Sequence, residues 1–88
     1  MKIKEGFKLK FIHGKCFVEP SEEEAHSFNK VIELDNSGKL LFEELLVGSS
    51  EEKLIKALMD NYKVNIMKAK KDVNQFLQIL KLNNLIEE

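Results

Sequence analysis

Residues able to carry out catalysis or to bind a metal ion are few in this chain and lie far apart. The two histidines, His13 and His26, have no second ligand at the spacing that metal sites use. The single cysteine, Cys16, points toward the core in the strand register described below, and no histidine is placed by the sequence to activate its thiol. We therefore expect these three side chains to be structural or solvent-exposed, with no metal site.

Carboxylates and glycines offer no stronger candidate for chemistry. The acidic runs at 22–24 and 43–44 fit an exposed loop and a helix face, whereas acid–base catalysis needs carboxylates that converge on a pocket. Gly38 is a lone glycine at a predicted helix start, and a phosphate-binding loop needs several glycines and a lysine at fixed positions. The sequence therefore predicts a protein that is not an enzyme and that binds no cofactor.

The composition indicates one small domain spanning residues 1–88. Hydrophobic residues make up 43% of the chain, which is enough for one modest core. No apolar run approaches the ~20 residues that span a membrane, and no signal peptide is visible. A lone cysteine fits a reducing compartment, so we expect a soluble cytoplasmic protein with no membrane partner.

Charge is nearly balanced overall but unevenly distributed along the chain. The net charge is −1, and all fourteen basic residues are lysines. Because arginine is the preferred residue for reading guanine, its absence disfavours a nucleic-acid partner. The first fifteen residues hold five lysines against one glutamate, which fits either a solvated face or a surface for an acidic partner.

Two segments near the N-terminus predict an antiparallel hairpin. Residues 7–12 alternate apolar and polar side chains, His13-Gly14 forms a two-residue turn, and residues 15–20 return as the second strand. This turn places Ile12 opposite Lys15 and fixes the register of the whole hairpin. The expected core face comprises Phe7, Leu9, Phe11, Cys16 and Val18. The expected outer face comprises Lys8, Lys10, Phe17 and Glu19, with a cross-strand ion pair and a lysine over an aromatic ring.

A third strand is predicted at residues 30–34, after a polar, acidic connection that Ala25 and Phe28 anchor to the core. In the expected strand order it lies at a sheet edge and offers unpaired backbone groups. Period-two alternation points Ile32 and Leu34 inward and Val31 and Glu33 outward.

Helical periodicity predicts two helices directly after this strand. The first spans about residues 37–47, is capped by Asp35 or Asn36 and ends at Gly48. The second starts at Ser49, with a glutamate three residues later that completes a capping box. The apolar stripes comprise Leu41, Phe42, Leu45 and Leu46 in the first helix and Leu54, Ile55, Leu58, Met59 and Tyr62 in the second.

A third helix is predicted over about residues 66–82, with Asn65 as its cap. Asn83-Asn84 ends it in a left-handed conformation, and Leu85 and Ile86 then fold back as a hydrophobic latch. Its core-facing residues are Ile66, Ala69, Val73, Phe76, Leu77 and Leu80. The expected fold class is α+β and winged-helix-like, with an N-terminal three-stranded antiparallel sheet followed by a three-helix bundle.

The order and spacing of three segments resemble the family of pyrroloquinoline-quinone biosynthesis protein D (PqqD), a peptide-chaperone type of RiPP recognition element. The resemblance covers essentially the whole chain. Asn83-Asn84 departs from the family, which often has a glycine there, but asparagine adopts the same backbone conformation. The residues that carry the resemblance are Val31 to Gly38, Leu41 to Leu46, the serine–glutamate start of the second helix, Asp72-Val73, Phe76-Leu77, Leu80 and Leu85-Ile86.

This resemblance implies a function in binding rather than in catalysis. Such domains bind the leader part of a precursor peptide as a strand added to the third strand, in the groove beside the third helix. They deliver it to a modifying enzyme, often a radical S-adenosylmethionine protein. Backbone pairing would supply affinity and side-chain pockets would supply choice of peptide, at micromolar to sub-micromolar strength, about 8–9 kcal/mol.

Two borders of the third helix could line that groove, and the sequence does not choose between them. One border holds Lys70, Asn74 and Lys81, and its lysines would suit acidic leader peptides. The other border holds Asp72 and Ile79. The expected peptide-binding residues are therefore Lys30, Val31, Ile32, Glu33, Leu34, Lys70, Asp72, Asn74, Leu77, Ile79 and Lys81.

Other classes of protein remain open at this point. Strands and three helices also fit a winged-helix DNA-binding protein, and the third helix carries Lys68, Lys70, Lys71 and Lys81. A structural subunit or a toxin–antitoxin-like partner would form a tight complex with another protein. The open sheet edge permits either a monomer or a homodimer.

Overall fold

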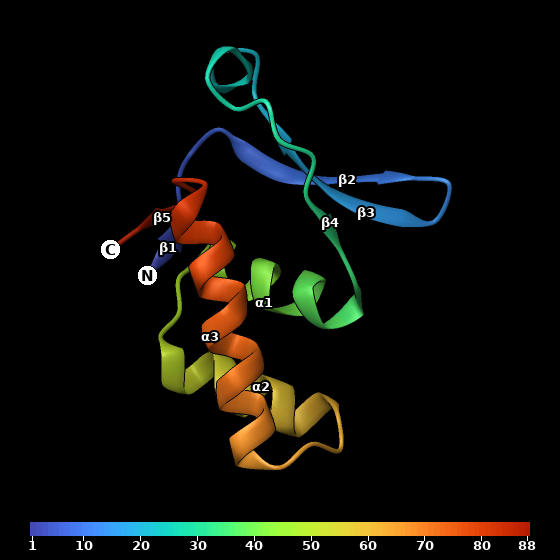
Figure 1. Ribbon diagram of the computed structural model, residues 1–88, viewed down its shortest axis with the longest axis vertical. Helices are drawn as coiled ribbons and strands as arrows, with labels where there is room; N and C mark the ends of the chain where they lie inside the picture. Colours follow the sequence, from blue (N-terminus) through green and yellow to red (C-terminus); the bar gives the residue numbers. More distant parts are fainter.

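A three-stranded antiparallel sheet lies across one end of three helices in the computed structural model, which describes residues 1–88 (Figure 1). The sheet has the order β2-β3-β4, so β4 is an edge strand, as predicted. This confirms the α+β class. The strands of the sheet are β2 (Phe7–Ile12), β3 (Lys15–Pro20) and β4 (Glu33–Leu34), and the helices are α1 (Asn36–Val47), α2 (Glu51–Asn61) and α3 (Ile66–Leu82).

The hairpin of β2 and β3 has the predicted register at all six residue pairs, from Phe7 opposite Pro20 to Ile12 opposite Lys15. His13 and Gly14 both adopt positive φ, 51° and 78°, the combination that a type I′ turn requires. That turn matches the twist of the flanking strands and so fixes which side chains share a face.

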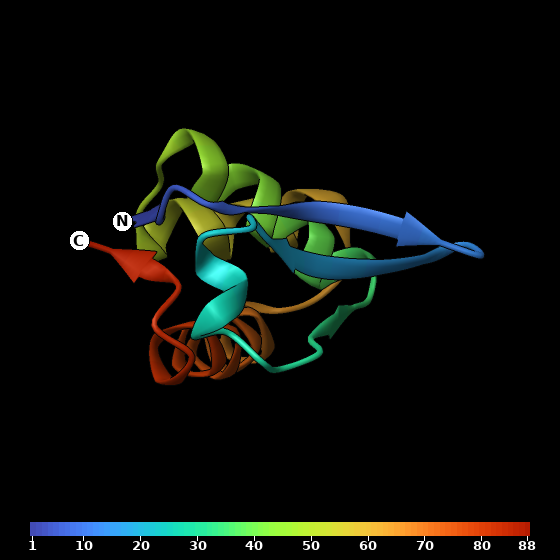
Figure 2. The same cartoon turned by 90° about the horizontal axis from the view of Figure 1, so that it is seen from above.

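Three details of the hairpin differ from expectation. Phe11 is on the helix-facing side but is 59% exposed, because the end of the hairpin extends past the helices (Figure 2). The lysine over an aromatic ring is not on the outer face: Lys39 of α1 places its ammonium 5.2 Å from the centre of the Phe11 ring. The cross-strand ion pair is the diagonal one between Lys10 and Glu19, at 3.9 Å.

The strand β4 is shorter than the predicted 30–34, since only Glu33–Leu34 has regular strand geometry. The inward and outward alternation is confirmed: Leu34 is buried and Ile32 half-buried, whereas Val31 and Glu33 are exposed. The connection before it contains a short helix, η1 (Glu24–His26). Phe28 anchors this connection by packing edge-on against Phe7, with ring centres 5.3 Å apart, but Ala25 is exposed and anchors nothing.

The helix boundaries follow local capping. Asp35 caps α1, Asn65 caps α3, and Gly48 ends α1 at a φ of 115°, as predicted. The predicted cap of α2 is wrong by one residue. Ser50, not Ser49, accepts a hydrogen bond from the N–H of Lys53. The residue three positions after the cap is therefore a lysine, and no capping box with a glutamate forms. Some stripe residues predicted to face the core lie at its borders or at a helix end and stay more than a third exposed, namely Leu46, Met59, Tyr62 and Ile66.

The end of α3 forms a Schellman motif. Asn84 is left-handed at a φ of 61°, the Leu85 N–H donates to the Leu80 carbonyl at 2.9 Å, and the Asn84 N–H donates to Lys81. Leu85 is fully buried, which confirms the predicted latch. The sequence did not predict the next element, β5 (Ile86–Glu87), which pairs with β1 (Lys2–Ile3) and brings the two ends of the chain together (Figure 1).

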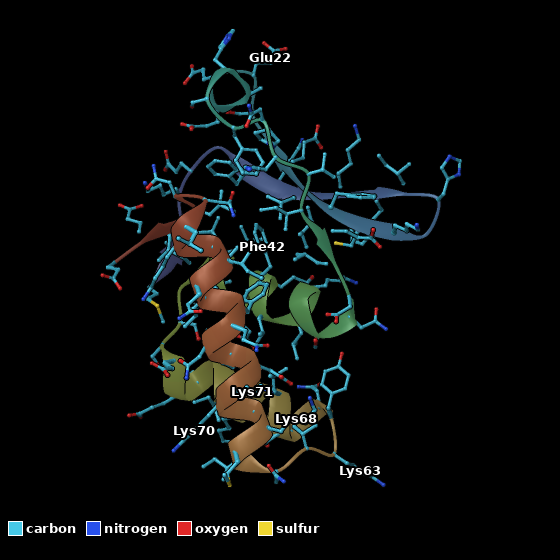
Figure 3. All side chains as sticks on the ribbon, in the orientation of Figure 1. Glu22, Phe42, Lys63, Lys68, Lys70 and Lys71 are labelled. Atoms are coloured by element: carbon cyan, nitrogen blue, oxygen red, sulfur yellow. The ribbon has the colours of Figure 1, made fainter.

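One apolar core joins the sheet to the helices. Phe42 of α1 is fully buried and lies between the sheet and α3 (Figure 3). No polar or charged side chain is buried with it. None of the helices has the length and apolar character that crossing a membrane would require.

Candidate functional site

An open groove of about 670 Å³ lies between α3 and the junction of β4 with α1. One wall is the sheet edge and the first turn of α1, the other wall is one face of α3, and the end of α2 closes the groove. Its lining comprises Ile32, Glu33, Leu34, Asp35, Asn36, Ser37, Gly38, Leu41, Leu58, Tyr62, Val64, Lys68, Asp72, Gln75, Phe76, Ile79 and Leu80.

The hydrogen bonds between β3 and β4 identify the free backbone groups at this wall. The Val18 N–H donates to the Ile32 carbonyl at 3.0 Å, and the register pairs Phe17 with Glu33. In an antiparallel pair, hydrogen-bonded and non-hydrogen-bonded residue pairs alternate, so Glu33 directs its N–H and C=O groups away from β3. Val31 lies beyond the paired residues, and continuing the same alternation past the Ile32 carbonyl predicts that its groups also point away from β3. The free edge of the sheet therefore consists of the main-chain groups of these two residues.

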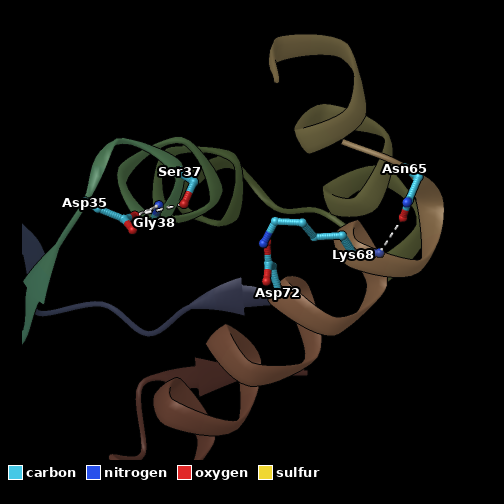
Figure 4. Close-up of polar contacts among 6 residues, drawn as sticks. All are labelled: Asp35, Ser37, Gly38, Asn65, Lys68 and Asp72. Carbon is cyan, nitrogen blue, oxygen red and sulfur yellow. Dashed lines mark hydrogen bonds and ion pairs between the residues drawn. The ribbon is translucent and has the colours of Figure 1, made fainter. Parts of the chain in front are cut away.

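The wall on α3 follows from helical spacing. Lys68, Asp72 and Phe76 are four residues apart and so lie on one face, and Ile79 continues that face toward the end of the helix. The Lys68 ammonium is 3.0 Å from the Asp72 carboxylate, an ion pair at i,i+4 spacing (Figure 4). This wall is therefore apolar toward the sheet end and charge-paired toward the start of α3.

The junction of β4 and α1 is held by Asp35. Its Oδ1 accepts hydrogen bonds from the Gly38 N–H and the Ser37 hydroxyl, both at 2.8 Å (Figure 4). The bond from Gly38, followed by the one from Ser37, holds the pKa of the Asp35 carboxyl below its usual value, so it is ionised at neutral pH. Gly38 is buried, and a Cβ there would meet Asp35 Oδ1 at 3.3 Å and Leu34 at 3.4 Å. The glycine thus lets α1 start directly against β4.

The structure brings some of the predicted site residues together and separates others. Ile32, Glu33, Leu34, Asp72 and Ile79 line the groove, so the Asp72 and Ile79 border of α3 is the one beside it. The remaining predicted residues do not line it: Lys30, Val31, Lys70, Asn74 and Lys81 are exposed, and Leu77 is buried in the core.

Sequence reasoning missed several lining residues. Lys68 and Phe76 lie four residues on either side of Asp72, and Gln75 lies four residues before Ile79. The helical repeat could therefore have found all three once one border had been chosen. Tyr62 and Val64 carry no such signal, because their position depends on how the turn between α2 and α3 folds back.

The residues with potential for other chemistry lie apart from the groove. His13 is exposed in the hairpin turn and His26 is exposed in η1. No group of three histidine, cysteine, aspartate or glutamate side chains is arranged to hold a metal ion. Cys16 is buried beneath the sheet, and burial raises the pKa of its thiol, with a smaller opposing effect from Lys39. None of the two histidines and the cysteine lines the groove.

One protein family and two solved structures are similar to this chain. The sequence model of the family described as "Coenzyme PQQ synthesis protein D (PqqD)" matches residues 18–86. A search of the curated proteins finds no match.

Two solved structures share the fold. "TbiB1 in Complex with the TbiA(beta) Leader Peptide" aligns over 99% of this chain and 95% of that chain, with a TM-score of 0.77 and 22% identity. "Lasso peptide synthetase B1 complexed with the leader peptide" aligns over 99% and 96%, with a TM-score of 0.74 and 16% identity. At these identities the likeness is one of fold.

Proposed function

The chain belongs to the PqqD family, and from that premise we propose that it is a peptide chaperone. In this proposal, residues 1–88 form one peptide-binding domain that holds the leader of a ribosomally made precursor peptide. The domain presents that peptide to a modifying enzyme, for which we expect a radical S-adenosylmethionine protein, and carries out no reaction itself. We expect it to act in the cytoplasm.

The observation that carries the proposal is the free edge of β4 beside an apolar groove. Glu33 directs its N–H and C=O groups outward, as strand addition requires, and the alternation predicts the same for Val31. Both solved structures with a similar fold are complexes with a leader peptide. A guest strand on this edge would extend the sheet and cover the groove.

The short length of the free edge determines how much of the binding energy comes from main-chain hydrogen bonds and how much from apolar contacts. Two outward-facing residues supply few main-chain hydrogen bonds, each worth about 0.5–1.5 kcal/mol net. Most of the affinity must then come from apolar guest side chains placed against Ile32, Phe76 and Ile79. Ordering the peptide opposes this gain, so we expect a dissociation constant near micromolar, about 8 kcal/mol.

DNA binding is not favoured. The chain has a net charge of −1 and no arginine, and three of the four charged residues that line its groove are acidic. Lys70 and Lys81 are exposed on α3 away from the groove and fit a solvated surface.

Titration of the isotope-labelled full chain with the leader of a precursor peptide encoded beside it tests the proposal. We expect amide signals to shift along residues 31–38 and along the groove face of α3, from Lys68 to Ile79. A scrambled leader of the same composition serves as the control. Shifts confined to β2, or none with any neighbouring precursor, would contradict the proposal.

A further inference from the structure

The charged side chains around the groove are not balanced. Four of the lining residues carry charge: Lys68 is positive, and Glu33, Asp35 and Asp72 are negative. Lys68 and Asp72 neutralise each other at 3.0 Å on α3. The sheet side of the groove is therefore left with two uncompensated carboxylates.

Neither of these carboxylates has a cation of its own. Glu33 is exposed and takes part in none of the ion pairs of the structure. Asp35 accepts hydrogen bonds only from neutral groups, which keep it ionised without cancelling its charge. The lysine nearest along α1, Lys39, is directed at the Phe11 ring and does not line the groove.

From this arrangement we propose that the β4 edge and the groove beside it together select leader segments in which a lysine or arginine stands between two apolar residues. The inference rests on the proposed function and specifies the chemistry of its ligand. It differs from the expectation of acidic leaders, because that expectation depended on Lys70 and Lys81, and neither lines the groove.

The sheet register assigns each part of this pattern to a side chain. A guest residue paired with Glu33 has its side chain on the same face as the Glu33 side chain, since neighbours across a sheet share a face. Opposite charges at such a position stabilise the pair and like charges destabilise it. A basic guest residue therefore fits beside Glu33, with Asp35 two residues further along.

In the guest peptide, the side chains of the residues before and after the basic residue point to the opposite face of the sheet. They lie on the face of Ile32 and Leu34 and so enter the groove between β4 and α3. There they meet the partly exposed apolar side chains of Tyr62, Phe76 and Ile79. An apolar–basic–apolar triplet thus satisfies both faces of the added strand at once.

Three synthetic leader peptides that differ only at the central residue of this triplet provide the test. With lysine at that position we expect about fivefold tighter binding than with glutamine, and with glutamate about fivefold weaker binding, at low ionic strength. Both differences should shrink at about 0.5 M salt, where exposed charges are screened, while the apolar contribution remains. Isothermal titration calorimetry measures all three affinities. Equal affinities, or tighter binding of the glutamate peptide, would overturn the inference.

Charge-changing variants separate a local effect from a general one. Glu33→Lys should reverse the order of the three peptides, and Glu33→Gln should reduce the lysine preference. Glu22→Lys makes the same change of charge on the exposed acidic connection, far from the groove (Figure 3), and should leave the preference unchanged. A lysine preference lost equally in Glu22→Lys and Glu33→Lys would show that net charge, not the groove, produces it, and would overturn the inference.

The same peptides distinguish this inference from the proposed function. If all three shift the amide signals of residues 31–38 with equal affinity, the peptide site stands and the charge selection is wrong. If none of them, nor the native leader, shifts those signals, both the site and its selectivity are wrong.

Discussion

The sheet has two free edges, and they are built in opposite ways. The edge at β2 belongs to a six-residue strand, carries Lys8 and Lys10, and contributes no residue to the groove. The edge at β4 belongs to a two-residue strand but borders an apolar groove along α3. Lysines on an edge strand are a common protection against unwanted pairing. If a guest strand docks at β4 as proposed, the adjacent groove, rather than the length of the strand, distinguishes this edge from the edge at β2.

Both edges offer backbone groups, which makes the comparison testable. Since Ile12 and Lys15 flank the two-residue turn as a hydrogen-bonded pair, alternation directs the N–H groups of Phe11 and Leu9 away from β3. Each edge thus has an outward-facing backbone N–H that a single substitution can remove. That of Val31 lies beside the groove, and that of Phe11 lies on the other edge. Equivalent substitutions at the two edges should have unequal consequences for peptide binding.

The largest effect is expected from placing a charge in the apolar part of the groove. Ile79 is 48% exposed, so Ile79→Asp should fold normally and yet remove an apolar contact with the guest. We expect leader binding to weaken by more than about tenfold, corresponding to the loss of roughly 1.5–3 kcal/mol of apolar burial. Calorimetric titration provides the measurement. Phe11→Asp on the far edge is the matched control, and a similar loss there would contradict the assignment of the site.

A smaller effect is expected from removing one backbone donor at the edge. Val31→Pro deletes an outward-facing N–H without breaking the Val18–Ile32 hydrogen bond, and proline is tolerated on edge strands. Loss of one net hydrogen bond of about 1 kcal/mol should weaken leader binding about fivefold. Phe11→Pro deletes an outward-facing N–H at the other edge and should leave binding unchanged. If both variants bind the leader as well as the parent does, strand addition at β4 is wrong.

The third effect is a loss of stability at the junction of β4 with α1, which has no counterpart at the β2 edge. Asp35→Ala removes the cap of α1 and should lower the free energy of unfolding by about 1 kcal/mol at neutral pH. The hydrogen bond from Gly38 is the main cause of the lowered pKa of Asp35 in the folded protein. A carboxyl with a lowered folded pKa stabilises the protein above its unfolded pKa, and this contribution is lost as pH falls through the folded value.

The difference in stability between the parent and Asp35→Ala should therefore be constant near neutral pH and should narrow below about pH 4. Urea denaturation at a series of pH values measures it. Asp35→Asn keeps a capping side chain that does not titrate, so its stability should lie close to that of the parent at neutral pH. A difference that grows on acidification would show that Asp35 is not held as a carboxylate.

The smallest effect on stability is expected from the contact between Lys39 and Phe11 of β2, the edge strand that borders no groove. Lys39→Met removes the ammonium above the Phe11 ring and should change the free energy of unfolding by no more than about 0.5–1 kcal/mol. Leader affinity should not change, since neither residue lines the groove. A clear drop in affinity would extend the binding surface toward the hairpin.

Local signals made much of this fold predictable from sequence. The His13-Gly14 turn determines the register of the hairpin because its backbone conformation leaves one way to pair the strands. Asn65 and the Asn83-Asn84 pair mark the two ends of α3, which spans the predicted residues. In each case a few neighbouring residues determine the structure.

The parts that were not predicted depend on distant contacts. Two-residue strands such as β1 and β5 have no detectable periodicity, and they pair across nearly the whole chain. Ser49 and Ser50 both satisfy the local signature of a cap, so sequence does not choose between them. Likewise the helical repeat shows which face of α3 is buried, but the angle at which α3 crosses the sheet decides which border meets the groove.

The shortness of the β4 edge has a consequence for timing. A dissociation constant near 1 μM, combined with association at about 10⁶ M⁻¹s⁻¹, gives a bound lifetime of about one second. An edge as long as β2 in the same place would form more hydrogen bonds and hold each guest for longer. In the proposed function, a strand of two residues would thus favour repeated binding and release, and one copy of the protein would serve many precursor molecules in succession.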